Sequence, residues 1–274
     1  MHLRIPVLMY HEIVPDDQPR DGRGRTHPDY LLPAQAFLEQ MQYLAEQGFS
    51  ALSAVDLVRA VTQRRMDGLP ERSVVITFDD GFVGNHHQAL PLLRKFGMQA
   101  TFFVTVAQIG APAMMSWDQL EALRAAGMGV CSHLWHHVIM AELSREEAFA
   151  ELFQSRNLLR DRLGQPVTLL SLPNGSYRRD YPELAREAGY LGGFCSRLGY
   201  VSAASNPFLL ERVPVLRSTS RARFARMAAG DRSVLTGAQI RRQAHTLVSA
   251  LVGESAVNRW YHRLNRIGAP DEKN

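Results

Sequence analysis

Short apolar segments alternate with segments of helical periodicity through roughly the first 200 residues of the chain. The apolar segments are bounded by turn-forming residues, which is typical of buried strands. Strands are therefore expected at 5–10, 73–78, 99–106, 128–132, 167–173 and 190–195. Regular alternation of strands with helices indicates a parallel sheet, either closed into a barrel or open and doubly wound.

The helical segments carry their own start and stop signals. Ser116 with Gln119 forms a capping-box signature. Ser144 with Glu147 forms a second one, and glycines follow several of the segments, as is usual at helix ends. Helices are expected at about 33–48, 53–67, 86–97, 116–127, 144–164 and 181–189. The polar, Pro- and Gly-rich segment 11–30 is expected to be a functional or mobile loop.

The tail from 233 to 267 has apolar positions at helical spacing, flanked by arginines. This pattern predicts a helix packed on the preceding domain. A second interpretation is a basic amphipathic helix that contacts an anionic membrane surface. That interpretation rests on three arginines and two aromatic residues close together: Arg259, Trp260, Tyr261, Arg263 and Arg266.

Composition narrows the class of protein. With 274 residues and 46% hydrophobic residues, the chain is long enough to bury a sizeable core. The net charge of +4 is mildly basic, and no nucleic-acid-binding module is recognisable, so no nucleic acid partner is expected. Two cysteines make no disulfide framework. The N-terminal apolar stretch is short for a signal peptide, so a cytoplasmic protein, in peripheral contact with the inner membrane at most, is expected.

Polar clusters follow four of the predicted strands. They are Tyr10-His11, Asp79-Asp80, the stretch "SHLWHH" at 132–137 and the stretch "LPNGSY" at 172–177. Sites in parallel α/β folds lie where the strands end, at the carboxyl edge of the sheet. We therefore expect these four clusters to lie close together.

His133 and His137 are four residues apart. On a helical turn this spacing places both imidazoles on one face, where they can share a metal ion. One aspartate of the Asp79-Asp80 pair would complete a His-His-Asp ligand set, and the other would stay ionised beside the metal and accept a proton from water. The alternative for Asp-Asp-Gly is a polar turn without a ligand.

The stretches "TFDDG" and "SHLWHH" together resemble the polysaccharide deacetylase family, the NodB homology domain, from about Ile5 to about Val215. The resemblance implies a distorted (β/α) barrel over residues 1–215, followed by a helical C-terminal extension over 216–274. It makes Asp79 the catalytic base. The metal ligands it implies are Asp80, His133 and His137. The metal implied is Zn²⁺, with Co²⁺ or Ni²⁺ as substitutes.

The chain departs from the family pattern in several places. The Ser or Thr that follows the first ligand is Leu134 here. The Arg-x-Pro-Tyr-Gly stretch is replaced by 171–175, "SLPNG", which lacks the arginine that orients the base. The backbone N–H of Asn174 can still stabilise an oxyanion. Arg178, Arg179 and Arg212 are the candidates to replace the arginine, and the sequence does not choose among them.

The N-terminal stretch "VLMYHEI" resembles a branch of the family that deacetylates exopolysaccharides. In that branch the acid histidine comes from the first strand, which gives His11 the role of general acid. Tyr10, Trp135 and Tyr177 are candidates for stacking on a sugar, against the alternative that they are core residues.

These inferences predict a metal-dependent hydrolase that removes N-acetyl groups from a saccharide or saccharide precursor and releases acetate. Biosynthesis of a cell-surface polysaccharide or glycolipid is the expected context. Three alternatives stay open: an O-acetyl esterase, a non-sugar amidase with the same site, and a catalytically silent saccharide-binding protein.

Overall fold

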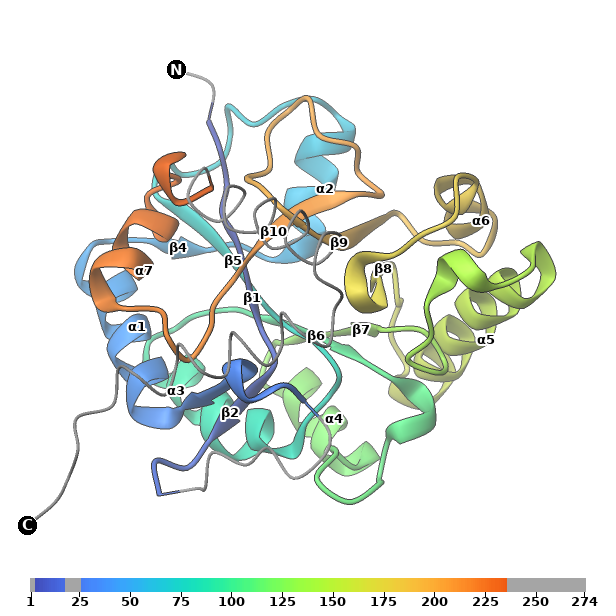
Figure 1. The fold of residues 1–274 in the computed structure, drawn as a ribbon, viewed down its shortest axis with the longest axis horizontal. Coiled ribbons are helices and arrows are strands. Elements are labelled where there is room, and N and C mark those ends of the chain that lie inside the picture. The colour runs from blue at the N-terminus through green and yellow to red at the C-terminus, as the bar shows by residue number, and fades with distance from the viewer. Residues whose placement is uncertain (1–2, 18–25, 236–274) are drawn as a thin grey trace, which may run out of the picture. The chain divides into compact units, whose positions relative to one another are not determined.

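The computed structural model describes residues 3–17 and 26–235. Within this part of the chain, parallel strands close into a barrel (Figure 1). Its strands are β1 (Val7–Tyr10), β5 (Ser73–Phe78), β6 (Thr101–Val104), β7 (Gly129–Ser132), β8 (Leu169–Ser171), β9 (Gly192–Leu198) and β10 (Leu210–Pro214). Each strand pairs with the next, and β1 closes the ring by pairing with both β5 and β10. Of the two architectures left open by the strand–helix alternation, the barrel is the one that forms.

Three short strands supplement the barrel. β4 (Ser50–Ala51) pairs with the beginning of β5, while β2 (Glu12–Val14) and β3 (Leu31–Pro33) form a separate parallel pair. β2 falls in the segment predicted to be a loop. It forms because the side chains of Ile13 and Val14 are buried. The many polar residues around these two make the strand hard to recognise from the sequence.

The helices begin and end largely where the capping signals predict. They are α1 (Ala34–Glu46), α2 (Ala54–Thr62), α3 (Leu90–Lys95), α4 (Trp117–Ala125), α5 (Arg145–Leu163), α6 (Tyr181–Glu187) and α7 (Arg221–Ala228). Both predicted capping boxes form, at the starts of α4 and α5. α2 ends earlier than predicted because Arg64, at φ 55°, leaves the helical region. Shorter helical turns are η2 (Pro28–Tyr30), η3 (Asn85–Ala89), η4 (Val106–Gln108), η5 (Met140–Glu142) and η6 (Pro173–Gly175).

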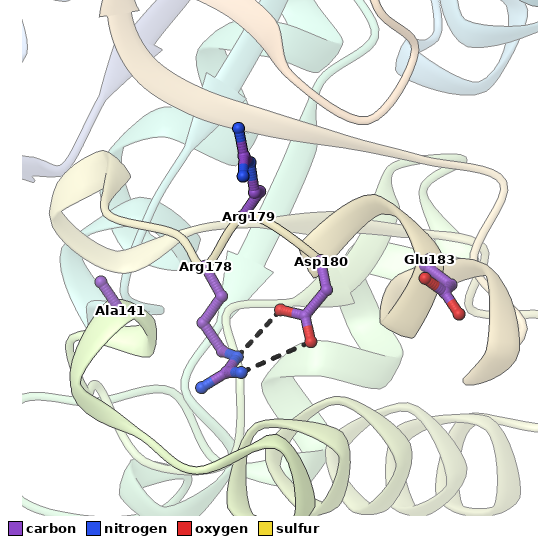
Figure 2. Close-up of a pocket in the computed structure, with 5 residues that line it drawn as sticks. All are labelled: Ala141, Arg178, Arg179, Asp180 and Glu183. Carbon is purple, nitrogen blue, oxygen red and sulfur yellow. Dashed lines mark hydrogen bonds and ion pairs between the residues drawn. The ribbon is translucent and has the colours of Figure 1, made fainter.

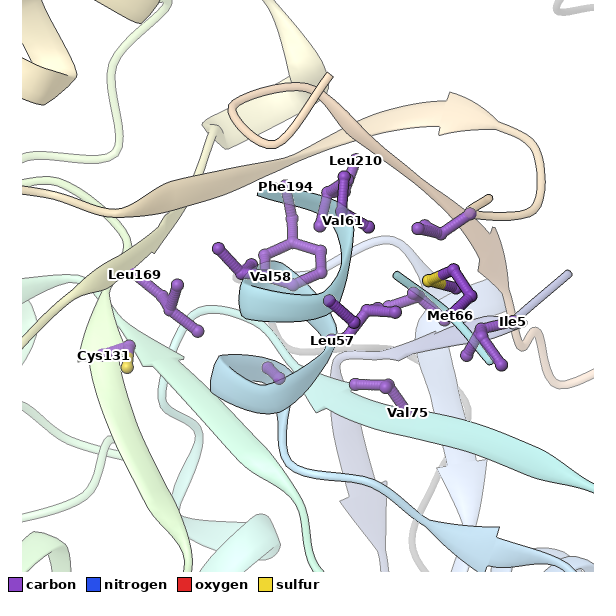
Figure 3. Packing of buried hydrophobic residues seen from close by; sticks show 14 of the residues in the cluster. Ile5, Leu57, Val58, Val61, Met66, Val75, Cys131, Leu169, Phe194 and Leu210 are labelled. Atoms are coloured by element: carbon purple, nitrogen blue, oxygen red, sulfur yellow. The ribbon is translucent and has the colours of Figure 1, made fainter. Parts of the chain in front are cut away.

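Apolar side chains fill the amino-terminal end of the barrel (Figure 3). Leu57 and Val58 of α2 belong to the same buried cluster as Val7, Leu169 and Leu210, each the first residue of its strand. α2 therefore covers this end with a dry core. The polar residues of interest follow the opposite, carboxyl ends of the strands.

The compact unit that holds the barrel ends at Gly230. α7 belongs to it and packs against α1, where the rings of Tyr43 and Phe224 lie 6.0 Å apart. Most of the predicted helical tail, including its cluster of arginines and aromatic residues at 259–266, lies outside the described residues. None of the helices in the described part of the chain has the length and apolar character that crossing a membrane requires.

We expect Phe194→Ala to lower the free energy of unfolding by about 3–5 kcal/mol, because a buried phenylalanine leaves a cavity when it is truncated. Phe194 is fully buried, and its ring lies 5.4 Å from that of Phe103. Urea denaturation measures the effect. Phe153→Ala is the matched control: Phe153 is 44% exposed, so its loss should cost about 1 kcal/mol or less. Equal losses in the two variants would contradict this account of the core.

Candidate active site

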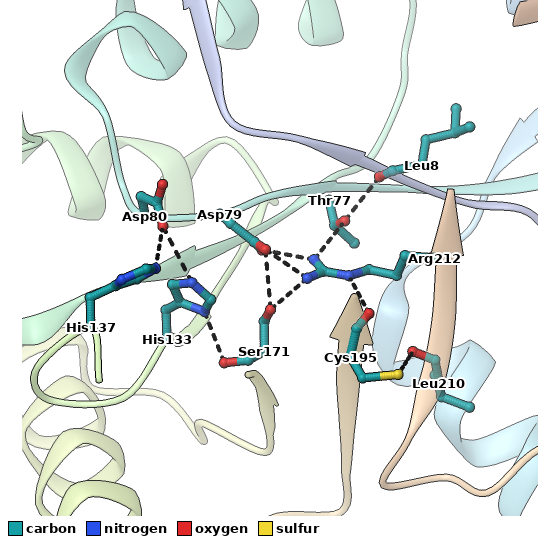
Figure 4. Close-up of polar contacts among 10 residues, drawn as sticks. All are labelled: Leu8, Thr77, Asp79, Asp80, His133, His137, Ser171, Cys195, Leu210 and Arg212. Carbon is teal, nitrogen blue, oxygen red and sulfur yellow. Dashed lines mark hydrogen bonds and ion pairs between the residues drawn. The ribbon is translucent and has the colours of Figure 1, made fainter. Parts of the chain in front are cut away.

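The two adjacent aspartates after β5 point in different directions. Asp80 has a left-handed backbone (φ 75°), a conformation that aspartate tolerates better than most residues. In Figure 4, Asp80 points toward the imidazoles of His133 and His137. Asp79 points instead toward Arg212. The turn thus separates two like charges and gives each its own compensating partners.

Asp80, His133 and His137 form a cluster with the geometry of a metal site. Asp80 Oδ1 lies 3.3 Å from Nε2 of His133 and 3.3 Å from Nε2 of His137. All three candidate ligand atoms lie within 4.8 Å of one another. His133 is buried and the side chain of His137 is 35% exposed, so the cluster opens to solvent on one side.

The donor atoms of this cluster suit a divalent cation. His133 Nδ1 lies 2.8 Å from the carbonyl oxygen of Ser171, which can only accept, so Nδ1 carries the proton and Nε2 offers its lone pair to the cluster. Asp80 Oδ1 is buried and accepts no hydrogen bond from any described residue. Burial alone would raise the pKa of Asp80, but the facing imidazoles lower it well below its usual range. An ionised oxygen and two imidazole nitrogens are ligands that Zn²⁺ favours.

The turn that carries the two histidines differs from the prediction. Residues 133–137 are not helical, because Leu134 takes a left-handed conformation (φ 66°) and its N–H donates to Ser132 Oγ at 3.1 Å. The predicted helical turn is therefore wrong. The imidazoles converge nonetheless, with ring centroids 5.1 Å apart.

Asp79 is held by a buried arginine from β10. Arg212 is fully buried and donates to both carboxylate oxygens, at 2.8 Å to Oδ1 and 2.6 Å to Oδ2 (Figure 4). Such a bidentate pair is the strong form of a charge-assisted hydrogen bond. Arg212 Nη2 also donates to Ser171 Oγ at 2.8 Å. Burial alone would raise the pKa of Asp79, but the charge and hydrogen bonds of Arg212 outweigh it and lower the pKa.

The other two candidate arginines lie elsewhere. Arg178 and Arg179 line a surface pocket with Ala141, Asp180 and Glu183 (Figure 2). Arg178 donates to Asp180 Oδ1 at 2.9 Å and to the carbonyl of Leu143. Of the three arginines that the sequence left open, Arg212 is the partner of Asp79.

His11 follows β1 beside the aspartates. Tyr10 pairs with Phe78 in the β1–β5 ladder, so the next residues along the two strands, His11 and Asp79, lie alongside each other. The ring of His11 contacts that of Tyr30, with centroids 4.0 Å apart, and its buried Nδ1 has no hydrogen-bond partner among the described residues. Burial lowers the pKa of His11, and the negative charges of Asp80 and Asp79 oppose this only in part.

Two further residues at this edge had no predicted role. Asn85 is fully buried, donates to the carbonyl of His11 at 2.7 Å and accepts from the N–H of Ile13 at 3.1 Å. It therefore fixes the backbone on both sides of Glu12. Burial, together with the charge of Asp80, raises the pKa of Glu12 to about 7. Nothing in the local sequence marks Asn85, because its two partners lie more than seventy residues away.

The residues predicted to face the substrate differ in how exposed they are. Tyr10 is fully buried, donates to Gln40 Oε1 at 2.8 Å and packs on Phe78, so its prediction as a sugar-binding residue is wrong. Trp135 is partly buried on the turn between the two histidines, and Tyr177 is 37% exposed. Asn174 is exposed in η6 with φ 56°. The roles of these last three residues stay predictions.

Comparison with known proteins finds deacetylases of saccharides among the proteins that this chain resembles. Residues 67–193 match the family model for polysaccharide deacetylase. The polysaccharide deacetylase homologue YxkH of Bacillus subtilis is 28% identical over 221 residues, covering 81% of this chain and 75% of that protein. The poly-β-1,6-N-acetyl-D-glucosamine N-deacetylase of Escherichia coli K12 is 28% identical over 158 residues, covering 51% of this chain but only 22% of that enzyme.

The fold has solved counterparts as well. The deacetylase PplD of Streptococcus pyogenes, solved in complex with acetate, superposes with a TM-score of 0.75. It is 24% identical, and the match covers 83% of this chain and 99% of that one. At this identity the similarity concerns the fold, and the barrel described above is thus a known architecture.

We expect Arg212→Met to lower the free energy of unfolding by about 3–5 kcal/mol at neutral pH, because it leaves Asp79 buried and unpaired. The loss should shrink on acidification. In the wild type, the lowered pKa of Asp79 stabilises the fold above the unfolded pKa of about 3.9, and this contribution is lost as the pH falls below that value. In the variant, protonation of Asp79 instead relieves an uncompensated charge.

Urea denaturation between pH 3 and pH 7 measures the difference between the two proteins. Arg197→Met is the control, since Arg197 forms a surface pair with Glu211 at 2.8 Å and is 58% exposed. Its loss should cost about 1 kcal/mol or less. A difference between wild type and Arg212→Met that stays constant with pH would show that the arginine acts through packing alone.

Proposed function

We propose that this chain, whose residues 67–193 match the polysaccharide deacetylase family model, is a metal-dependent hydrolase that cleaves the acetamido group of an N-acetylated saccharide and releases acetate. The observation that carries the proposal is that two functional groups lie together at the carboxyl end of the barrel strands. One is the Asp80, His133 and His137 cluster, and the other is the Asp79 carboxylate beside it, which is paired with Arg212. Metal-assisted hydrolysis needs both, a cation site and a base within reach of it.

Asp80 Oδ1 and the Nε2 atoms of His133 and His137 would hold the metal, with Zn²⁺ as the proposed ion and Co²⁺ or Ni²⁺ as substitutes. When bound, such an ion polarises the acetyl carbonyl and lowers the pKa of a water molecule. The carbonyl of Ser171 keeps His133 in the tautomer that can ligate, through the 2.8 Å contact to Nδ1.

Asp79 acts as the general base in this proposal. It takes a proton from water as the water oxygen attacks the carbonyl carbon, and Arg212 keeps the carboxylate ionised and fixed in orientation. The carbonyl oxygen gains negative charge, and the backbone N–H of Asn174 is the proposed protein donor for it. His11 then gives a proton to the amide nitrogen, the C–N bond breaks, and acetate and a free amine leave.

The proposed substrate is an N-acetylhexosamine unit in a cell-surface polysaccharide, or in a precursor of one. The similarity to an enzyme that deacetylates poly-β-1,6-N-acetyl-D-glucosamine supports this class. Trp135 and Tyr177 are the proposed stacking faces for the sugar. Acetate release with added Zn²⁺ or Co²⁺ should be assayed on poly-β-1,6-N-acetylglucosamine fragments, chitooligosaccharides and O-acetylated sugars. Release from O-acetyl esters alone would replace the amidase with an esterase, and release from no acetylated sugar would refute the proposal.

We expect Asp79→Asn to keep the metal and lose about 10²–10⁴-fold in turnover, the usual contribution of a general base. Metal content by elemental analysis and acetate release measure the two properties separately. Thermal unfolding is the control, because the substitution also removes the charge partner of Arg212. A folded variant with nearly wild-type turnover would remove Asp79 from this role.

We expect His11→Ala to lower turnover while leaving metal content unchanged. The protonated form of His11 is needed, and burial lowers its pKa, so wild-type turnover should fall as the pH rises. This alkaline limb should flatten in the variant. The pH–rate profiles of the two proteins provide the measurement, and an unchanged limb would mean that the acid lies elsewhere.

A further inference from the structure

A carboxylate on α5 holds the turn between the two histidines of the candidate metal site. Glu151 Oε2 accepts hydrogen bonds from the backbone N–H groups of Trp135 at 2.9 Å and His136 at 2.8 Å. Glu151 Oε1 lies 2.6 Å from Nδ1 of His136. The Glu151 side chain is only 13% exposed. One side chain thus binds two of the three residues between His133 and His137 and neither of the histidines at the ends of the turn.

The opposite side of the turn is held by main chain. The carbonyl of Leu134 accepts from the N–H of Val106 at 3.2 Å, and that of Trp135 accepts from the N–H of Ala107 at 2.8 Å. The turn is therefore fixed between η4 on one side and α5 on the other. Its N–H groups have no helical partners, because the turn is not helical, so Glu151 supplies the acceptors that they need.

The turn also needs an external support. Leu134 has φ 66°, a conformation that costs a leucine about 1–2 kcal/mol. The position after the first histidine carries no side-chain hydroxyl that could bridge the turn from within, because Leu134 is apolar and fully buried. Of the N–H groups of the turn, Ser132 Oγ accepts only from that of Leu134, and the carboxylate of Glu151 on α5 accepts from the two N–H groups that follow.

We propose that Glu151 is a positioning residue for metal binding. It acts through the backbone of Trp135 and His136 to hold His133 and His137 at ligating distance before the ion arrives. This preorganisation removes part of the ordering cost that a free turn would add to metal binding. The inference rests on the proposed function, since it takes the histidine pair as ligands.

Metal affinity of the purified 274-residue chain tests the role without any assay of turnover. Co²⁺ and Zn²⁺ are titrated in competition with a chromogenic chelator, and the visible spectrum of the Co²⁺ form reports the ligand geometry. We expect Glu151→Ala to bind about 10–100-fold more weakly, as is usual when an outer support of a ligand is lost. Glu146→Ala is the matched control, because Glu146 is an exposed carboxylate on the same helix, and its affinity should equal that of the wild type.

Two conservative variants separate geometry from charge. Glu151→Gln keeps the length and one carbonyl oxygen that can accept both backbone N–H groups, so it should restore most of the affinity. Glu151→Asp keeps the charge but is one methylene too short to reach the turn, so it should bind as weakly as the alanine variant. The reverse order, with Asp strong and Gln weak, would show that Glu151 attracts the cation only through its charge and would overturn the positioning role. These two variants also decide the question if Glu151→Ala fails to fold.

A failure of the Glu151 role and a failure of the metal site would give different results. Equal affinities in Glu151→Ala and Glu146→Ala would reject the positioning role while leaving the metal site intact. A wild-type protein that binds Co²⁺ no better than Asp80→Ala does would instead refute the metal site itself.

Discussion

The buried ion pair between Asp79 and Arg212 is the contact on which the rest of the site depends. A carboxylate that is 2% exposed would normally lose its charge, and a bidentate guanidinium is what keeps it ionised. Through Arg212 Nε the same contact extends to the carbonyl of Cys195 on β9, at 3.1 Å. The pair therefore ties β5, β9 and β10 together at the point where the proposed reaction takes place. Without it, Asp79 would be a buried charge with no compensating guanidinium beside the candidate metal site.

Much of this arrangement could be predicted because its signals are local. Strand ends, capping boxes, the Asp79-Asp80 pair and the spacing of His133 and His137 are each encoded within a few neighbouring residues. Asp80 and the two histidines then converge as expected because parallel strands share an edge. Arg212 could not be chosen from sequence, since it lies 133 residues from Asp79 and reaches it only through barrel closure. The prediction that Tyr10 stacks on a sugar is wrong for a related reason. A residue at a strand end can point into the core as easily as into the mouth, and only packing against Phe37 and Phe78 decides.

The conformation of the turn at residues 133–137 shows a different limit of prediction from sequence. The four-residue spacing of His133 and His137 suits a helix, yet the two imidazoles meet on a non-helical turn supported from outside by Glu151. Spacing constrains which residues can meet but does not determine the backbone between them. The support comes from α5, about fifteen residues further along the chain, and its role depends on an orientation that no motif records.

Barrel closure also has a consequence for biosynthesis. The proposed metal ligands lie after β5 and in the turn after β7, so all of them have been translated by residue 137. Arg212 arrives only with β10, the strand that must insert between β9 and the first strand of the chain. A nascent or truncated chain that ends before residue 212 thus carries every proposed ligand but leaves Asp79 without its counter-charge. Because β1 and β10 are distant in sequence, their pairing carries a loop-closure entropy cost. The site is therefore complete only once the barrel has closed.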